Sequence, residues 1–377
     1  MSLRGFGLSV LFIAVLAGCG KKDDGVAVIK IGSVAPLSGA QTHIGKDNEN
    51  GTRLAIDEIN AAGLSLGGKP VRLELIGEDD GAEPKTANIV AQKLIDSGVV
   101  AVIGHLNSGT SIPAAKLYSD AGIAQISPSA TAVKYTAQGY KTAFRVMAND
   151  AQQGAVLGQF AVKKLGAKRI ALIDDRSAYG QGLADEVEKA VKTAGGSIID
   201  RQYTTDKATD FSAILTAIKA KNADLIVFGG MDPQAGPMAK QMKSLGLKAQ
   251  LLGADGMQNG NFIKLAAADA EGVIASSPGL PLATMPGGPG FKQRFIAKYG
   301  EIQLYAPYAY DATQVLIAAM KRADSAEPAK ILAALTQTDH TGVTGPIRFD
   351  AKGDVTGGAV TLYQVKGGAW TTLETIK

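Results

Sequence analysis

Short apolar runs that alternate with helical segments constrain the fold of this chain more than any other feature of its sequence. Residues 99–131 give the clearest example: the apolar run Val99–Ile103, a polar turn, a helical segment closed by Gly122, the short strand Ala124–Ser127 and a second polar turn. Short apolar runs without a helical period are typical of parallel strands buried on both faces, with helices as their connections. The pattern predicts an α/β fold with mostly parallel sheets.

Hydroxyl-bearing residues fill both polar turns of this stretch. Asn107 and Ser108 precede a helix that carries Pro113 in its first turn, and Ser129 and Thr131 follow the second strand. Loops at the carboxyl ends of neighbouring parallel strands commonly hold a small ligand, and a helix amino end favours an anion such as a carboxylate. Helix capping alone is the more common role of such residues in any single loop.

A second stretch, residues 224–256, repeats the same order of elements, which favours a ligand site over capping. Its last loop carries Asp255 in place of the hydroxyls of Ser129 and Thr131. Hydroxyls can donate hydrogen bonds to a carboxylate, and a carboxylate can accept them from an ammonium group. The two sets of loops together predict a binding site for a zwitterion such as an amino acid.

The composition argues against several other classes of function. A net charge of +4 from scattered basic residues does not indicate a nucleic-acid surface. One cysteine rules out an intrachain disulfide, and the three histidines, His43, His105 and His340, form no cluster with zinc-ligand spacing. The length of 377 residues favours two domains. We therefore expect a two-domain protein without a metal site.

Near-matches to nucleotide-binding and catalytic motifs fail on inspection. Residues 63–69 have the spacing of a phosphate-binding loop, but Pro70 stands where a Ser or Thr is needed. The Gly180–Gly182 turn resembles a dinucleotide fingerprint, but Asp185 occupies the place of the third glycine. There is no G-x-S-x-G elbow, and no histidine has a nucleophile pattern nearby. The sequence predicts neither a catalytic constellation nor a cofactor.

The beginning of the chain has the pattern of a targeting segment followed by a tether. Arg4 precedes the apolar run Leu8–Leu16, which is too short to span a membrane as a helix. The following residues, ending in Cys19, match the bacterial lipobox, whose recognition implies removal of residues 1–18 and lipid attachment to the cysteine sulfur. Residues 19–25 would then tether the protein to a membrane surface, in the periplasm or at the cell surface. A plain secretory signal is the alternative.

Four segments of the chain resemble the leucine/isoleucine/valine-binding proteins of bacterial ABC importers: IKIGSVAPLSGAQTHIG, NGTRLAIDEINAAGLSLGGKPVRLELIGEDDGAEP, VIGHLNSGT with the later ISPSATA, and DDRSAYGQGLADEV. The resemblance covers nearly the whole mature chain. It implies a type I periplasmic binding fold, in which two similar doubly wound α/β lobes, joined by three hinge crossings, close on a ligand. It implies an amino-acid-binding protein without enzymatic activity, whose partner is an ABC permease. A small-molecule or amide sensor of the same fold, and an extracytoplasmic enzyme, are the alternatives.

The resemblance also implies roles for individual residues. Ser108 and Thr131 would bind the α-carboxylate of the ligand, and Ser129, mainly through its backbone, the amino group. Asp255 would face the ammonium, with Tyr179 joining it from the second lobe. The residues expected along the side-chain pocket are Leu106, Asn107, Met231 and Tyr305.

The chain departs from this family at several of the same places. Ile44 and Met231 stand where well-known members have tyrosines, and Ala82 and Asn107 stand where those members have a disulfide. Asp255 is shorter than the usual glutamate. The part of the site that would bind the amino acid backbone is therefore kept, whereas the preference for a side chain is open and could extend to a larger or different apolar group.

The order of predicted elements also divides the chain between the two lobes. Residues 26–148 and 278–352 are assigned to the first lobe, and residues 149–277 and 353–377 to the second. Within them we expect helices at 48–62, from Gln152 onward and at 305–320, a return crossing near 278–289, and a terminal hairpin at 357–372.

Overall fold

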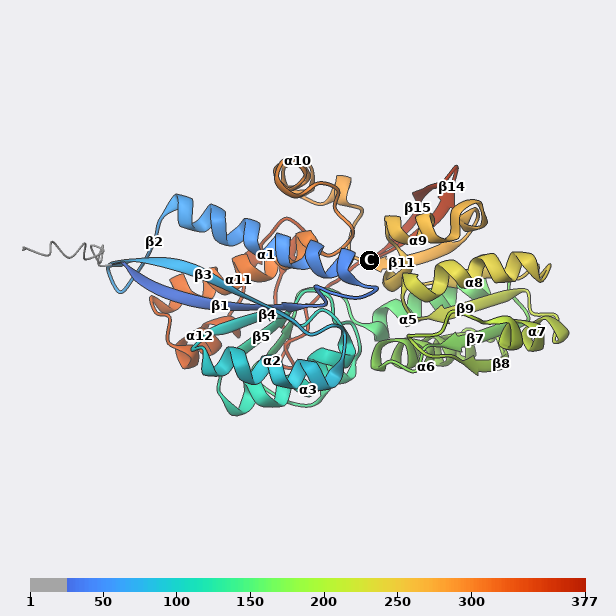
Figure 1. Ribbon diagram of the computed structural model, residues 1–377, viewed down its shortest axis with the longest axis horizontal. Helices are drawn as coiled ribbons and strands as arrows, with labels where there is room; N and C mark the ends of the chain where they lie inside the picture. Colours follow the sequence, from blue (N-terminus) through green and yellow to red (C-terminus); the bar gives the residue numbers. More distant parts are fainter. Residues whose placement is uncertain (1–25) are drawn as a thin grey trace, which may run out of the picture.

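Two α/β lobes lie side by side along the long axis of the molecule, each built on its own sheet (Figure 1). The computed structural model describes residues 26–377, so the predicted signal segment, Cys19 and the tether lie outside the described residues. Among residues 26–377, every helix is too short or too polar to cross a membrane. The predicted α/β fold with mostly parallel sheets is confirmed.

The first lobe is organised on a six-stranded sheet with the order β2-β3-β1-β4-β5-β6. All neighbours are parallel except the short edge strand β2, which pairs antiparallel with β3. Its strands are β1 Ala27–Ala35, β2 Leu64–Leu66, β3 Lys69–Asp79, β4 Ala101–Gly104, β5 Ala124–Ser127 and β6 Ala143–Arg145. Its helices are α1 Thr42–Ala62, α2 Pro84–Asp96, α3 Ser108–Asp120, α4 Lys134–Ala137, α10 Gly288–Tyr299, α11 Ala306–Ala323 and α12 Pro328–Leu335.

The second lobe is organised on a seven-stranded sheet with the order β15-β14-β11-β10-β9-β7-β8, in which the last two strands of the chain form an antiparallel edge. Its strands are β7 Ile170–Asp174, β8 Ile198–Tyr203, β9 Leu225–Gly229, β10 Gln250–Gly253, β11 Ile274–Pro278, β14 Val360–Lys366 and β15 Ala369–Ile376. Its helices are α5 Asp150–Gln159, α6 Ala178–Thr193, α7 Ser212–Ala220, α8 Asp232–Ser244 and α9 Gly260–Ala266. A small ladder, β12 His340–Thr341 with β13 Pro346–Ile347, lies apart from both sheets.

The central strands are buried on both faces, as the apolar runs predict. Every residue of β4, β5, β7 and β9 is buried, because helices cover both sides of each sheet. One hydrophobic cluster extends from the core of the first lobe, through Ile31 and Ile103, to that of the second, through Leu172 and Val227. The two lobes thus share apolar contacts where they meet.

The chain passes between the lobes three times, after β6, after β11 and between β13 and β14, as predicted. Arg145, at the first crossing, is completely buried. Its guanidinium donates to Asp354 Oδ1 in the third crossing at 2.9 and 2.5 Å, and to the carbonyl oxygens of Ala130 and Ala132 at 2.7 and 2.9 Å. Because each donor has an acceptor, the buried charge fixes two crossings and one loop of the first lobe together.

Two sequence-based helix boundaries were wrong in ways that matter for the site, and one edge strand was missed. Helix α1 begins at Thr42, not at residue 48, so His43 and Ile44 lie on a helix. Helix α5 begins at Asp150, not at Gln152, because Asn149 caps it by accepting from the N–H groups of Ala151 and Gln152. The strand β2 was not predicted.

Candidate ligand-binding site

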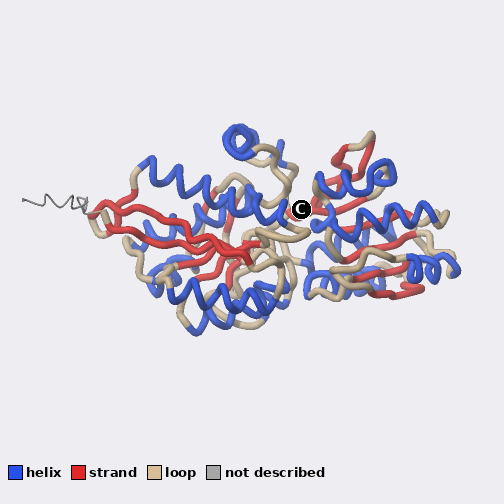
Figure 2. The backbone as a smooth tube through the Cα atoms, in the orientation of Figure 1, coloured by secondary structure: helices blue, strands red, loops and turns tan. Residues whose placement is uncertain are grey.

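The candidate site lies between the lobes, where the loops that leave the carboxyl ends of both sheets come together. Figure 2 shows loops gathered between the two groups of strands and helices. The loops that follow β4 and β5 come from the first lobe, and those that follow β7, β9 and β10 come from the second. This is the edge at which open α/β sheets hold ligands.

The three candidate hydroxyls of the first lobe differ in whether they already have a hydrogen-bond partner. Ser108 Oγ accepts a hydrogen bond from the Ala132 N–H at 3.1 Å, and Ser129 Oγ donates to the Leu106 carbonyl at 3.0 Å. Thr131 Oγ1 is buried and has no hydrogen-bond partner. The two serines therefore join the loops after β4 and β5, and the threonine is left with an unused hydroxyl.

Asp255, which follows β10, is the acceptor of the second lobe. Its Oδ1 accepts from Gln153 Nε2 at 2.7 Å and from the Tyr179 hydroxyl at 3.0 Å, and its Oδ2 accepts from the Tyr305 hydroxyl at 2.8 Å. Burial raises the pKa of Asp255, and the hydrogen bonds from Gln153, Tyr305 and Tyr179 act against this rise. Gln153 and Tyr179 belong to the second lobe, whereas Tyr305 reaches across from the first.

Asp150, which sequence reasoning did not single out, lies between Thr131 and Asp255. Gln153 Nε2 contacts both Asp150 Oδ1, at 3.3 Å, and Asp255 Oδ1. Burial raises the pKa of Asp150 to about 8, and the charge of Asp255 raises it further. The Asp150 N–H donates to the Thr131 carbonyl at 2.8 Å, so the two predicted anchors, Thr131 and Asp255, belong to one continuous buried polar group. In the sequence, Asp150 is an acidic residue next to the helix cap Asn149, and nothing there indicates that it links the two anchors.

Apolar side chains from both lobes meet beside this group. Leu106, Ile44 and Tyr305 of the first lobe share a hydrophobic cluster with Tyr179 and Met231 of the second. Asn107, also expected along the pocket, lies at its edge and donates through Nδ2 to Gln41 Oε1 at 2.7 Å. The sulfur of Met231 and the ring of Tyr179 both pack against Gly256, where a Cβ would approach them to 2.7 and 3.1 Å.

Further polar contacts hold the lobes together. His43 Nε2 of α1 lies 3.1 Å from Asp232 Oδ2 of α8, and Asp232 is completely buried. Lys207 Nζ contacts Glu83 Oε1 at 2.5 Å nearer the surface. With the Tyr305–Asp255 bond, these contacts define a closed arrangement of the lobes.

Several buried polar atoms at this junction have no partner. They include atoms of five residues at or near the junction: Asn107 (Oδ1), Thr131 (Oγ1), Asp150 (Oδ2), Asp175 (Oδ2) and Asp232 (Oδ1). Buried polar groups are normally satisfied. Unused hydrogen-bonding atoms gathered at one place therefore indicate a site built for a polar guest.

Within residues 26–377, no group of three or more His, Cys, Asp or Glu is placed to hold a metal ion. His105 is fully buried, with Nδ1 2.8 Å from Asp80 Oδ2 and Nε2 3.1 Å from the Tyr118 hydroxyl. Both ring nitrogens are therefore occupied within the first lobe.

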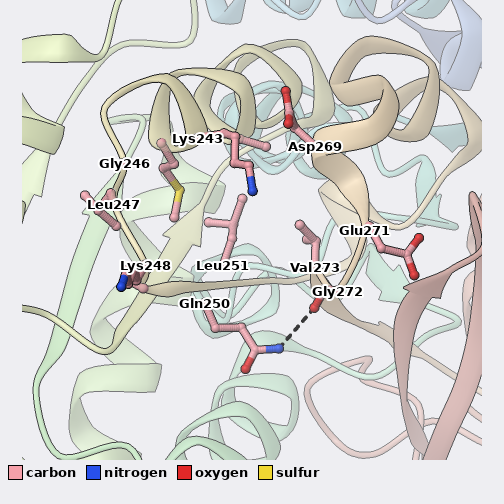
Figure 3. A pocket seen from close by; sticks show the side chains of 13 residues that line it. Lys243, Gly246, Leu247, Lys248, Gln250, Leu251, Asp269, Glu271, Gly272 and Val273 are labelled. Atoms are coloured by element: carbon pink, nitrogen blue, oxygen red, sulfur yellow. Dashed lines mark hydrogen bonds between the residues drawn. The ribbon is translucent and has the colours of Figure 1, made fainter.

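A second hollow, of about 570 Å³, lies on the second lobe far from this junction (Figure 3). It is lined at the amino ends of β10 and β11 by Lys243, Asp269 and Glu271, and Gln250 Nε2 donates to the Gly272 carbonyl at 3.0 Å beside it. This is the end of the sheet opposite the ligand-binding edge.

Two lobes joined by three crossings, with a buried polar group between them, define a solute-binding protein that closes on its ligand. The family model described as periplasmic binding protein matches residues 28–369, and the chain belongs to that family. It is 34% identical over 367 residues, 97% of both chains, to an amino acid binding protein of Pseudomonas aeruginosa. It is 33% identical, over 95% of both chains, to the leucine-, isoleucine-, valine-, threonine-, and alanine-binding protein of the same species.

Solved structures show the same relationship. The leucine binding protein LivK of Thermotoga maritima superposes with a TM-score of 0.86 at 28% identity, over 93% of this chain and 99% of the other. The branched-chain amino acid transporter substrate binding protein LivJ of Streptococcus pneumoniae, in complex with isoleucine, gives a TM-score of 0.83 at 30% identity, over 93% and 99%. The predicted resemblance and the type I two-lobed fold are confirmed.

Proposed function

We propose that this protein binds an α-amino acid between its lobes, without chemical conversion, and delivers it to an ABC permease. The observation that carries the proposal is the continuous buried group from Thr131 to Asp255, which offers an unused hydroxyl at one end and a carboxylate at the other. Burying a zwitterion costs several kcal/mol unless each of its charges has a partner. This buried polar group supplies a partner for both charges.

In this proposal each lobe binds one end of the ligand. Thr131, with Ser108 and the uncapped amino end of α3, binds the carboxylate. Asp255 and Tyr179 bind the ammonium, with the backbone of Ser129 beside them. The aliphatic part of the ligand packs against Leu106, Asn107, Met231 and Tyr305. Relatives whose names state leucine, isoleucine or valine as ligands make branched-chain amino acids the first candidates.

The cellular setting follows from the family and from the beginning of the chain. We infer that the protein works outside the cytoplasm, because the matching family is that of periplasmic binding proteins. We also infer that lipid on Cys19 anchors it to a membrane surface. Mass spectrometry of the protein from bacterial membranes tests the anchor: an acylated Cys19 is expected, and Cys19→Ala should release the protein into the soluble fraction.

A ligand screen is the decisive experiment for the proposed function. Purified protein is titrated calorimetrically with leucine, isoleucine, valine, alanine and threonine, and with short amides. We expect saturable binding of at least one free amino acid and none of its decarboxylated amine. Binding of short amides alone would favour the sensor alternative, and a chemically altered ligand recovered by chromatography would show an enzyme.

A further inference from the structure

A cavity of about 330 Å³ opens from the proposed site toward the surface, between the lobes. Its lining includes Asn107, Tyr179 and Met231, three residues of the proposed site, together with Asp175 and Asp206 of the second lobe. The volume is at the lower end of the range of roughly 300–1,000 Å³ found for small-molecule sites. The cavity therefore has room for one ligand side chain that continues past Met231.

Two acceptor atoms of its lining residues, Asp175 Oδ2 and Asn107 Oδ1, have no hydrogen-bond partner. Asp175 is only 2% exposed, and its Oδ2 has no hydrogen-bond partner, while Oδ1 accepts from the Ser177 N–H at 2.9 Å and hydroxyl at 2.6 Å. Oδ2 lies beside Gly230, where a Cβ would approach it to 3.0 Å. Across the cavity, Asn107 Oδ1 is unpartnered because Nδ2 faces Gln41.

The charges around Asp175 also favour a ligand group that donates hydrogen bonds. Burial raises the pKa of Asp175 to about 6, against the hydrogen bonds from Ser177, and the charges of Asp206 and Asp174 add to the rise. The one cationic side chain among the lining residues, Arg176, lies over the Tyr203 ring, 3.8 Å from its centroid, with Nε 3.7 Å from Asp174 Oδ1. Asp175 Oδ2 therefore lacks a counter-charge.

The geometry points to a subsite for a ligand side chain that ends in N–H donors: an amide, ureido or guanidinium group. Its aliphatic stem packs on Met231 and Tyr179, and its tip donates to Asp175 Oδ2 and Asn107 Oδ1. This inference rests on the proposed function and narrows it, from amino acids in general to those with a long side chain and a polar tip. Met231, which stands where the resemblance implies a tyrosine, lines this cavity.

The test compares ligands of similar length with and without donors. Glutamine, citrulline, arginine, norleucine and leucine are titrated calorimetrically into the wild type and into Asp175→Asn. Asparagine keeps an Oδ1 acceptor for Ser177, and so keeps the start of α6, but it replaces the free acceptor by a donor. We expect at least one donor-ended ligand to bind about tenfold or more tighter than norleucine, and Asp175→Asn to remove this difference.

Controls separate this inference from the function on which it rests. Asp269→Asn makes the same change in the distant hollow and should leave every affinity unchanged, and melting temperatures of both variants report folding. If norleucine or leucine binds as tightly as every donor-ended ligand, and Asp175→Asn changes no affinity, the subsite is refuted and amino acid binding stands. If none of the five ligands binds, and the screen above also finds no amino acid, both proposals fail.

Discussion

The two lobes contribute to the site in different ways. In the first lobe, Ser108 and Ser129 are tied to backbone groups of their own lobe, so the loop that presents Thr131 is complete without closure. In the second lobe, Asp255 receives one of its three side-chain donors, Tyr305, from the opposite lobe. The first lobe is thus a fixed surface for docking, whereas the acidic site is completed only on closure. A ligand should dock on the first lobe and be retained by the second.

The largest effect is expected from Asp255→Ala. It leaves the ligand ammonium unpaired in a buried place and removes the acceptor of Tyr179, Tyr305 and Gln153. Breaking a buried charge pair costs roughly 3–5 kcal/mol, so calorimetry should show amino acid affinity falling by more than a hundredfold. Uncharged amides should be much less affected. An equal loss of affinity for amides and amino acids would contradict the assignment of Asp255 to the ammonium. It would indicate that Asp255 acts only in closing the lobes.

Thr131→Ala tests the docking surface of the first lobe. The unused hydroxyl should donate to the ligand carboxylate, and loss of a hydrogen bond to a charged group costs roughly 1.5–3 kcal/mol. Calorimetry should show affinity weaker by about tenfold to a hundredfold. Thr131→Ser, which keeps the hydroxyl, is the matched control and should retain most of the affinity. An unchanged affinity in Thr131→Ala would remove the carboxylate assignment.

Tyr305→Phe sharpens the distinction between docking and retention. The variant loses only the hydroxyl that reaches Asp255 from the first lobe, at 2.8 Å. Stopped-flow fluorescence should show ligand dissociation faster by about tenfold, with the association rate nearly unchanged, because the docking surface is intact. A lower association rate with normal dissociation would contradict the proposed order of events.

Asp150 makes stability depend on pH. Its pKa is raised from 3.8 to about 8 in the folded protein, so the folded chain binds a proton that the unfolded chain has lost. The stabilisation from this proton is complete below about pH 4 and is lost as the pH rises to about 8. Asp150→Asn imitates the protonated acid, so its melting temperature should match the wild type near pH 4 and exceed it by several degrees at pH 8.5. Parallel curves for the two proteins would refute this role.

The smallest effect is expected at the edge of the junction. Lys207 and Glu83 join the lobes with side chains that are 72% and 47% exposed. Exposed ion pairs contribute little, so Lys207→Gln should change ligand affinity by less than about threefold at low salt and not at all at high salt. A larger change would show that surface charges, and not the buried polar contacts, hold the lobes closed.

The sequence predicts the strands and loops of this site better than the contacts between their side chains. Short apolar runs and glycine-bounded turns were sufficient for the parallel sheets, and the loops that carry Ser129, Thr131 and Asp255 follow strands as expected. Gln153 and Asp255 are 102 residues apart in sequence, and no local pattern shows that their side chains meet. Asp150 was placed in a connection because the start of α5 was put two residues late. His43 was likewise placed in a loop, so its contact with Asp232 could not be anticipated.

Arg145 links the third crossing between the lobes to the loop that carries Thr131. Its Nη1 donates to the carbonyl groups on both sides of Thr131, and its Nε and Nη2 donate to Asp354 in the third crossing. The guanidinium therefore keeps the peptide units beside the threonine in place while the crossing bends. Opening the molecule would withdraw Asp255 from a ligand and leave the hydroxyl that faces its carboxylate where it was.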